Sequence, residues 1–82
     1  RAYPNPFNPA INIEINSFEE SITDVSIISF SGQFVKNIFT GKILNSTQII
    51  LWEPENLSSG IYFVRLINDK NQYKYRKITY LK

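Results

Sequence analysis

The chain has 82 residues, of which 43% are hydrophobic, 15% aromatic and 20% charged, and its net charge is +2. This apolar content suffices for a folded core and is too high for a disordered chain. The length predicts one small domain, residues 1–82. The sequence holds no apolar run near the roughly 20 residues that a membrane helix needs, and so small a charge does not favour a nucleic-acid partner.

Cysteine and histidine are both absent. Without cysteine the chain has no disulfide, no thiolate nucleophile and no Cys-based zinc site. Without histidine it lacks the commonest general base, which excludes a Ser-His triad. Acidic pairs such as Glu19-Glu20 and Glu53/Glu55 fall in predicted turns of a chain too small to build a cleft around them. We therefore predict a non-catalytic domain with no cofactor, metal or small-molecule substrate.

The first ten residues are rich in proline, with Pro4, Pro6 and Pro9 among them. Proline fixes φ and favours an extended conformation in the residue before it. Residues 1–10 are therefore predicted to be a stiff, extended lead-in from a preceding linker, attached to the domain by Tyr3 and Phe7.

Alternating hydrophobic residues predict β-strands along the rest of the chain. The clearest case is 11–16, with three isoleucines on one face. Residues 17–20 read as a polar connection, Ser31-Gly32-Gln33 as a tight turn, and Thr40-Gly41-Lys42 as a second turn, after which Ile43 and Leu44 form an irregular crossing. The predicted strands are 11–16, 22–30, 34–39, 46–52, 60–67 and 73–81.

Residues 57–68 form the segment around which the chain is organised. Gly60 allows a sharp turn into a strand rich in β-branched, aromatic and aliphatic residues. Tyr62 and Val64 are expected to face the core, while the opposite face, marked by Arg65, is apolar enough to be partly covered, as in a central strand. In the last strand Tyr73 and Tyr75 have one parity and Ile78 and Tyr80 the other. A bulge near Arg76 would bring all four side chains to one face.

Six or seven short strands with frequent turns and no helical period predict an all-β fold, an immunoglobulin-like antiparallel β-sandwich of about seven strands. Trp52 is expected to contribute most to the core because it shares parity with Ile50. The complete predicted core is Ile11, Ile13, Ile15, Val25, Ile27, Val35, Ile50, Trp52, Tyr62, Val64, Leu66, Ile78 and Tyr80.

Several motifs occur in an order that resembles a known family. Pro4-Asn5-Pro6-Phe7 is followed by an alternating strand, Ser31-Gly32, Trp52, the string Leu-Ser-Ser-Gly-Ile-Tyr-Phe-Val at 57–64, and a terminal Lys82. This order resembles the type A C-terminal sorting domain of the type IX secretion system of Bacteroidetes-type bacteria. The immunoglobulin-like domain of flagellar hook-capping proteins shares the Pro-Asn-Pro-Phe start but resembles the chain less after Trp52.

One residue departs from the sorting-domain pattern. Ser29 stands where such domains often carry Asp before the Gly turn, which makes the side-chain cap of that turn less charged.

The resemblance implies a signal domain at the C-terminus of a secreted protein. Its partners would be the type IX translocon, the outer-membrane shuttle and sortase components, with a cargo domain preceding it in the same chain. The cargo would pass through the periplasm of a Gram-negative bacterium and then be released or attached to the cell surface. Pro4, Asn5, Pro6 and Phe7 would set the path from the cargo linker.

The last strand carries the densest cluster of charge in the chain. Lysines at a strand edge often only prevent aggregation, but the family motif ends at Lys77 and Lys82, so we predict that these two lead recognition. The candidate recognition residues are Lys74, Arg76, Lys77 and Lys82.

A carbohydrate-binding or spacer module of a secreted multidomain enzyme is the main alternative. Such modules are also small β-sandwiches, and Tyr73, Tyr75 and Tyr80 would form an aromatic strip for sugars, although tyrosines here can equally cover a thin core. Two further readings are weaker. Asp69 with Asn68 and Asn71 would make a poor calcium site, and stacking of single-stranded nucleic acid on the last strand conflicts with the low charge.

Overall fold

The computed structural model describes residues 1–16, 21–43 and 47–82, and within them it contains seven strands and no helix. No described segment therefore forms a helix long and apolar enough to cross a membrane. The strands are β1 (Ala2–Tyr3), β2 (Ile11–Asn16), β3 (Ser21–Ser29), β4 (Phe34–Ile43), β5 (Thr47–Trp52), β6 (Gly60–Asn68) and β7 (Tyr73–Tyr80).

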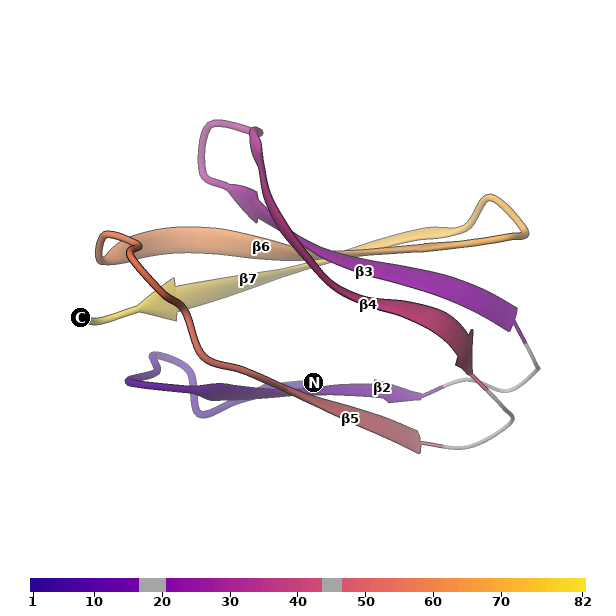
Figure 1. Cartoon of the computed structure of the whole chain (residues 1–82), viewed down its shortest axis with the longest axis horizontal. Helices are drawn as coiled ribbons and strands as arrows, with labels where there is room; N and C mark the ends of the chain where they lie inside the picture. The colour runs from indigo at the N-terminus through magenta and orange to yellow at the C-terminus, as the bar shows by residue number, and fades with distance from the viewer. Residues whose placement is uncertain (17–20, 44–46) are drawn as a thin grey trace.

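The strands form two antiparallel sheets packed face to face, as Figure 1 shows. One sheet has the order β1-β2-β5 and the other the order β4-β3-β6-β7. The all-β sandwich predicted from the alternation is confirmed, and β6 is a central strand as its apolar composition indicated. The predicted connection at 17–20 and residues 44–46 lie outside the described part of the chain.

The core lies between the sheets, where the inward residues of each strand meet. Nearly all of the predicted core is buried, and only Val35 and Leu66 are partly exposed at its margin. Phe7 and Ile43 also belong to the core and were not predicted. Trp52 keeps 5% of its surface exposed and its ring centroid lies 5.9 Å from that of Phe7, so it is a core residue and not a sugar platform.

The lead-in is part of the sandwich. β1 pairs with β2, with Ala2 opposite Ile13, and Phe7 is 2% exposed between the sheets. The prediction of an extended lead-in attached by Tyr3 and Phe7 was incomplete, because it included neither the β1 pairing nor Phe7 as a core residue. Alternation does not occur in so proline-rich a segment, so the sequence carried no strand signal there.

The predicted turn at Thr40-Gly41-Lys42 was wrong, because β4 continues through it to Ile43. Gly41 lies opposite Thr23 on β3, and a Cβ at this position would lie 3.2 Å from the Phe39 ring. The glycine thus leaves room for an aromatic side chain against the strand. Glycine in a strand often marks such a close approach.

The predicted turn at 31–33 is confirmed. Gly32 has a φ of +91°, a conformation that glycine adopts at little cost. The Ser29 Oγ accepts a hydrogen bond from the Gln33 N–H at 3.0 Å. Ser29 therefore provides the side-chain cap that Asp often provides in the sorting domains that the sequence resembles.

The suggested bulge near Arg76 is absent from the pairing of β6 with β7, which runs unbroken from Gly60 opposite Tyr80 to Ile67 opposite Tyr73. The irregular register lies instead between β3 and β4. Tyr73 and Tyr75 consequently face outward and are exposed, whereas Tyr80 is buried. The three tyrosines do not form one strip.

Replacing Trp52 by Ala should lower the free energy of unfolding by about 3–5 kcal/mol, because it leaves a cavity between the sheets. The measurement is urea unfolding followed by far-UV circular dichroism. The matched control is Leu51→Ala on the same strand, where the side chain is 66% exposed, with an expected change within about 0.5 kcal/mol. Equal effects of the two substitutions would contradict the burial of Trp52.

Candidate recognition site on the last strand

The start of the chain is hydrogen-bonded to its last strand. The Asn5 Nδ2 donates to the Lys77 carbonyl at 3.2 Å, and the Asn5 Oδ1 accepts from the Thr79 N–H at 2.9 Å. The Asn5 amide thus binds β7 as the main chain of a neighbouring strand would. Asparagine suits this position because one side chain offers both a donor and an acceptor.

Phe7 extends the same pairing with its own main chain. Its N–H donates to the Thr79 carbonyl at 2.9 Å, and its carbonyl accepts from the Leu81 N–H at 3.0 Å. Its ring stacks on that of Tyr80 with centroids 5.1 Å apart. Phe7 therefore anchors the last strand both at its edge and in the core. Pro4 and Pro6, on either side of Asn5, are exposed.

These contacts cover half of the outer edge of β7. They use the main chain of Lys77, Thr79 and Leu81, and main-chain groups of alternate residues in a strand point to the same side. Tyr73 and Tyr75 therefore direct their N–H and C=O groups to this edge as well. Within the described residues, no hydrogen bond to those outward groups is found. Lys77 stands at the boundary between the covered and open halves.

The four predicted recognition residues do not form one cluster. Lys74 and Arg76 lie on the inner face of β7 and line a hollow of about 80 Å³ with Glu14 and Arg1 at the open side of the sandwich. Lys77 has the opposite parity and lies on the outer face. Lys82 follows the strand, and its N–H donates to the Ser59 Oγ at 2.7 Å.

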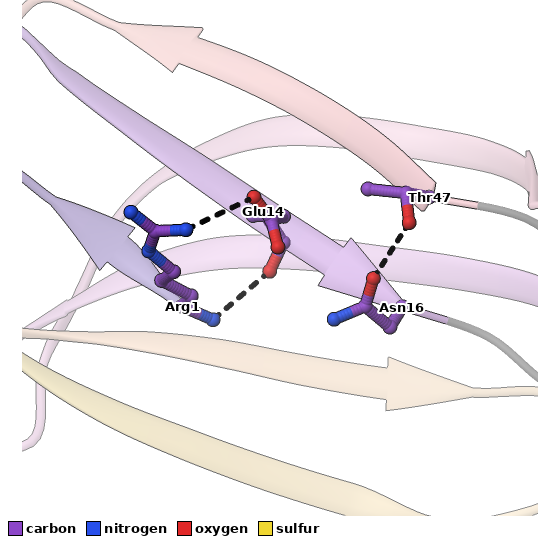
Figure 2. Close-up of polar contacts among 4 residues, drawn as sticks. All are labelled: Arg1, Glu14, Asn16 and Thr47. Atoms are coloured by element: carbon purple, nitrogen blue, oxygen red, sulfur yellow. Dashed lines mark hydrogen bonds and ion pairs between the residues drawn. The ribbon is translucent and has the colours of Figure 1, made fainter.

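Glu14 is paired with Arg1. Its main chain pairs with that of Arg1, and its Oε2 lies 4.0 Å from the Arg1 guanidinium (Figure 2). The same figure shows the Thr47 hydroxyl donating to Asn16 at 2.7 Å, which joins β5 to the end of β2.

Two structural motif residues also have clear roles. Tyr62 is buried, and its hydroxyl donates to the Ser58 carbonyl at 2.8 Å. A tyrosine bonded in this way to backbone just upstream is a feature of immunoglobulin-like sandwiches. Gly60 is the first residue of β6 and lies opposite Tyr80. Sequence reasoning placed Tyr62 in the core correctly but did not show that the Ser59 hydroxyl accepts the Lys82 N–H.

Asn68, considered for calcium binding, is held by hydrogen bonds of its own turn, and Glu19 and Glu20 lie outside the described residues. The Asn68 Oδ1 accepts the N–H groups of Lys70 and Gln72, which is ordinary turn chemistry. The Asp24 carboxylate accepts from Ser26 and Thr40. Among the described residues, no three His, Cys, Asp or Glu side chains gather where they would hold a metal ion.

Comparison with known proteins identifies the family. Residues 1–80 match the family described as the secretion system C-terminal sorting domain. The chain belongs to this family. The family supports a role as a sorting signal for type IX secretion, which implies a secreted or cell-surface protein. The order of the motifs in the sequence indicated the same family. No curated protein and no solved structure matched the chain.

Replacing Asn5 by Ala should expose the Thr79 amide and destabilise the sorting domain by about 1–2 kcal/mol, since two hydrogen bonds at an exposed site are lost. Hydrogen exchange measured by NMR should show faster exchange of the Thr79 amide. The control is Asn8→Ala, because Asn8 is exposed on the same segment and should leave Thr79 protected. An unchanged Thr79 exchange rate in the Asn5 variant would contradict the pairing.

Proposed function

We propose that this sorting domain directs a cargo domain of the same chain through the type IX translocon. The outer-membrane shuttle and sortase components would then read it, and the cargo would be released or attached to the cell surface of a Gram-negative bacterium. The family consists of sorting signals, which are non-catalytic in general, and we propose the same for this chain. The domain then acts through protein–protein contact alone.

The open half of the β7 edge carries this proposal. Pairing of main chains at a sheet edge provides affinity without catalytic groups, and the side chains beside the edge provide specificity. Asn5 and Phe7 cover the edge from Lys77 onward, so a receptor strand would have access to Tyr73 and Tyr75. Lys77 borders that stretch and is exposed.

The charge of the last strand supports an acidic receptor surface. Residues 70–82 contain four lysines and one arginine but no Asp or Glu. Complementary charge accelerates encounter and selects the partner more than it adds affinity. We propose that Lys77 and Lys82 contribute most, and that Lys74 and Arg76 contribute from the opposite face.

The accessory-module alternative now rests on two tyrosines. Tyr73 and Tyr75 are exposed on one face of β7, while Trp52 and Tyr80 are buried. A sugar site would therefore be shorter than the sequence indicated. Export of a fused cargo distinguishes the two functions, because a carbohydrate-binding or spacer module would not direct export.

The first test is the localisation of a fluorescent protein fused ahead of Arg1, given an export signal and expressed in a bacterium with the type IX pathway. We expect delivery to the surface or the medium, and loss of delivery when the pathway is disabled. Retention in the periplasm with the pathway intact would contradict the sorting function, and binding to insoluble polysaccharides would then be measured.

The second test neutralises the proposed recognition residues. Lys77→Gln with Lys82→Gln should reduce export of the fusion at least fivefold without lowering its melting temperature, since both side chains are exposed. The control is Lys36→Gln on β4, at the far edge of the same sheet. Equal export of both variants would exclude the lysines. Deleting 76–82 is less informative because it also removes the buried Ile78 and Tyr80.

A further inference from the structure

The outer face of the four-stranded sheet, turned away from β2 and β5, contains an apolar hollow. We call it the outer hollow. It has a volume of about 290 Å³ and lies across the end of β3, the following turn, β6 and β7. Its main lining residues are Ile28, Phe30, Gly32, Phe63, Arg65 and Tyr75.

The outer hollow exposes large apolar side chains. Phe30 is 71% exposed at its rim and Tyr75 is 57% exposed, while Ile28 forms a buried floor outside the main core. Adjacent Phe34 on β4 is also exposed. A group of exposed aromatic residues on a small domain is typical of an interaction surface.

Arg65 adds an unsatisfied polar group to this apolar site. Its Nε is buried and has no hydrogen-bond partner among the residues that the structure describes. Ser26 and Tyr75 lie directly opposite Arg65 on the neighbouring strands. A buried donor without a partner is costly, and a guanidinium is satisfied best by a carboxylate that accepts two of its N–H groups.

The described part of the sandwich provides no carboxylate for Arg65. Asp24 lies on the same face, opposite Ile67, but its oxygens accept the hydroxyls of Ser26 and Thr40. The ion pair found among the described residues joins Arg1 and Glu14, on β2 of the other sheet. On the β7 side, Lys77 lies opposite Phe63 and adds positive charge.

We propose that the outer hollow binds an acidic, apolar segment of a partner protein. An aliphatic or aromatic side chain of the segment fills the hollow over Ile28 and Phe63, and a neighbouring carboxylate accepts N–H groups from the Arg65 guanidinium. The charge of this face selects an acidic segment. The inference goes beyond the sorting function, because Arg65, Ile28 and Phe63 bind the segment and have no part in the proposed sorting contacts.

An NMR titration of the ¹⁵N-labelled 82-residue chain tests the proposal. The probe is the blocked peptide acetyl-Thr-Val-Glu-Phe-Thr-amide, and the control probe replaces its glutamate by glutamine. The glutamate peptide should shift the Arg65 Nε–H and the amides of Ile28, Phe63 and Tyr75. The glutamine peptide should bind at least fivefold more weakly, since it cannot neutralise the guanidinium.

Protein variants provide the second part of the test. Arg65→Gln should abolish the preference for the glutamate peptide, and Arg65→Lys should restore only part of it because lysine lacks the planar fork. Arg1→Gln is the matched control, since this arginine lies beside Glu14 on the other sheet. Backbone spectra establish that each variant is folded.

Several results would overturn the proposal. These are equal binding of the two peptides, shifts confined to the inner face, and unchanged binding by Arg65→Gln. Shifts of the same amides by cellohexaose, but not by the peptide, would assign the outer hollow to sugar. Shifts there that grow with protein concentration alone would assign it to a second copy of the chain.

Discussion

The pairing of Asn5 and Phe7 with the last strand is the contact on which the rest of this sandwich depends. In so small a domain the core is thin. Phe7 contributes to it from the segment between β1 and β2, outside the strands. The ring contacts Trp52 from one sheet and Tyr80 from the other. A single aromatic side chain therefore joins the two sheets at the end of the sandwich where β7 finishes.

This pairing also leaves open the main-chain edge at which we propose that the sorting domain is recognised. Asn5 replaces a missing neighbouring strand with one side-chain amide, so β7 is covered where it ends and open where it begins. A sheet edge that is partly covered is protected from self-pairing and still available to a specific partner. The motif at the start and the charged motif at the end are thus parts of one structure.

The two faces of β7 carry different side chains because side chains alternate along a strand. Lys74 and Arg76 line the open side of the sandwich, while Tyr75 and Lys77 lie on the outer face beside Arg65. A cluster that is continuous in sequence is therefore divided in space. This division separates Lys74 and Arg76 from the outer hollow, whereas Lys77 lies on the same face as the hollow.

Local patterns in the sequence determined the fold class, most strand positions and nearly all of the core, because alternation reports directly which residues a sheet buries. Motif order determined the family. Tertiary structure alone decided three things: that Phe7 is a core residue, that Gly41 continues a strand beneath an aromatic ring, and that Arg65 lies unpaired in a hollow. Phe7 packs against Trp52 and Tyr80, and Gly41 pairs with Thr23 on β3. Such contacts join residues distant in sequence, which no local pattern encodes.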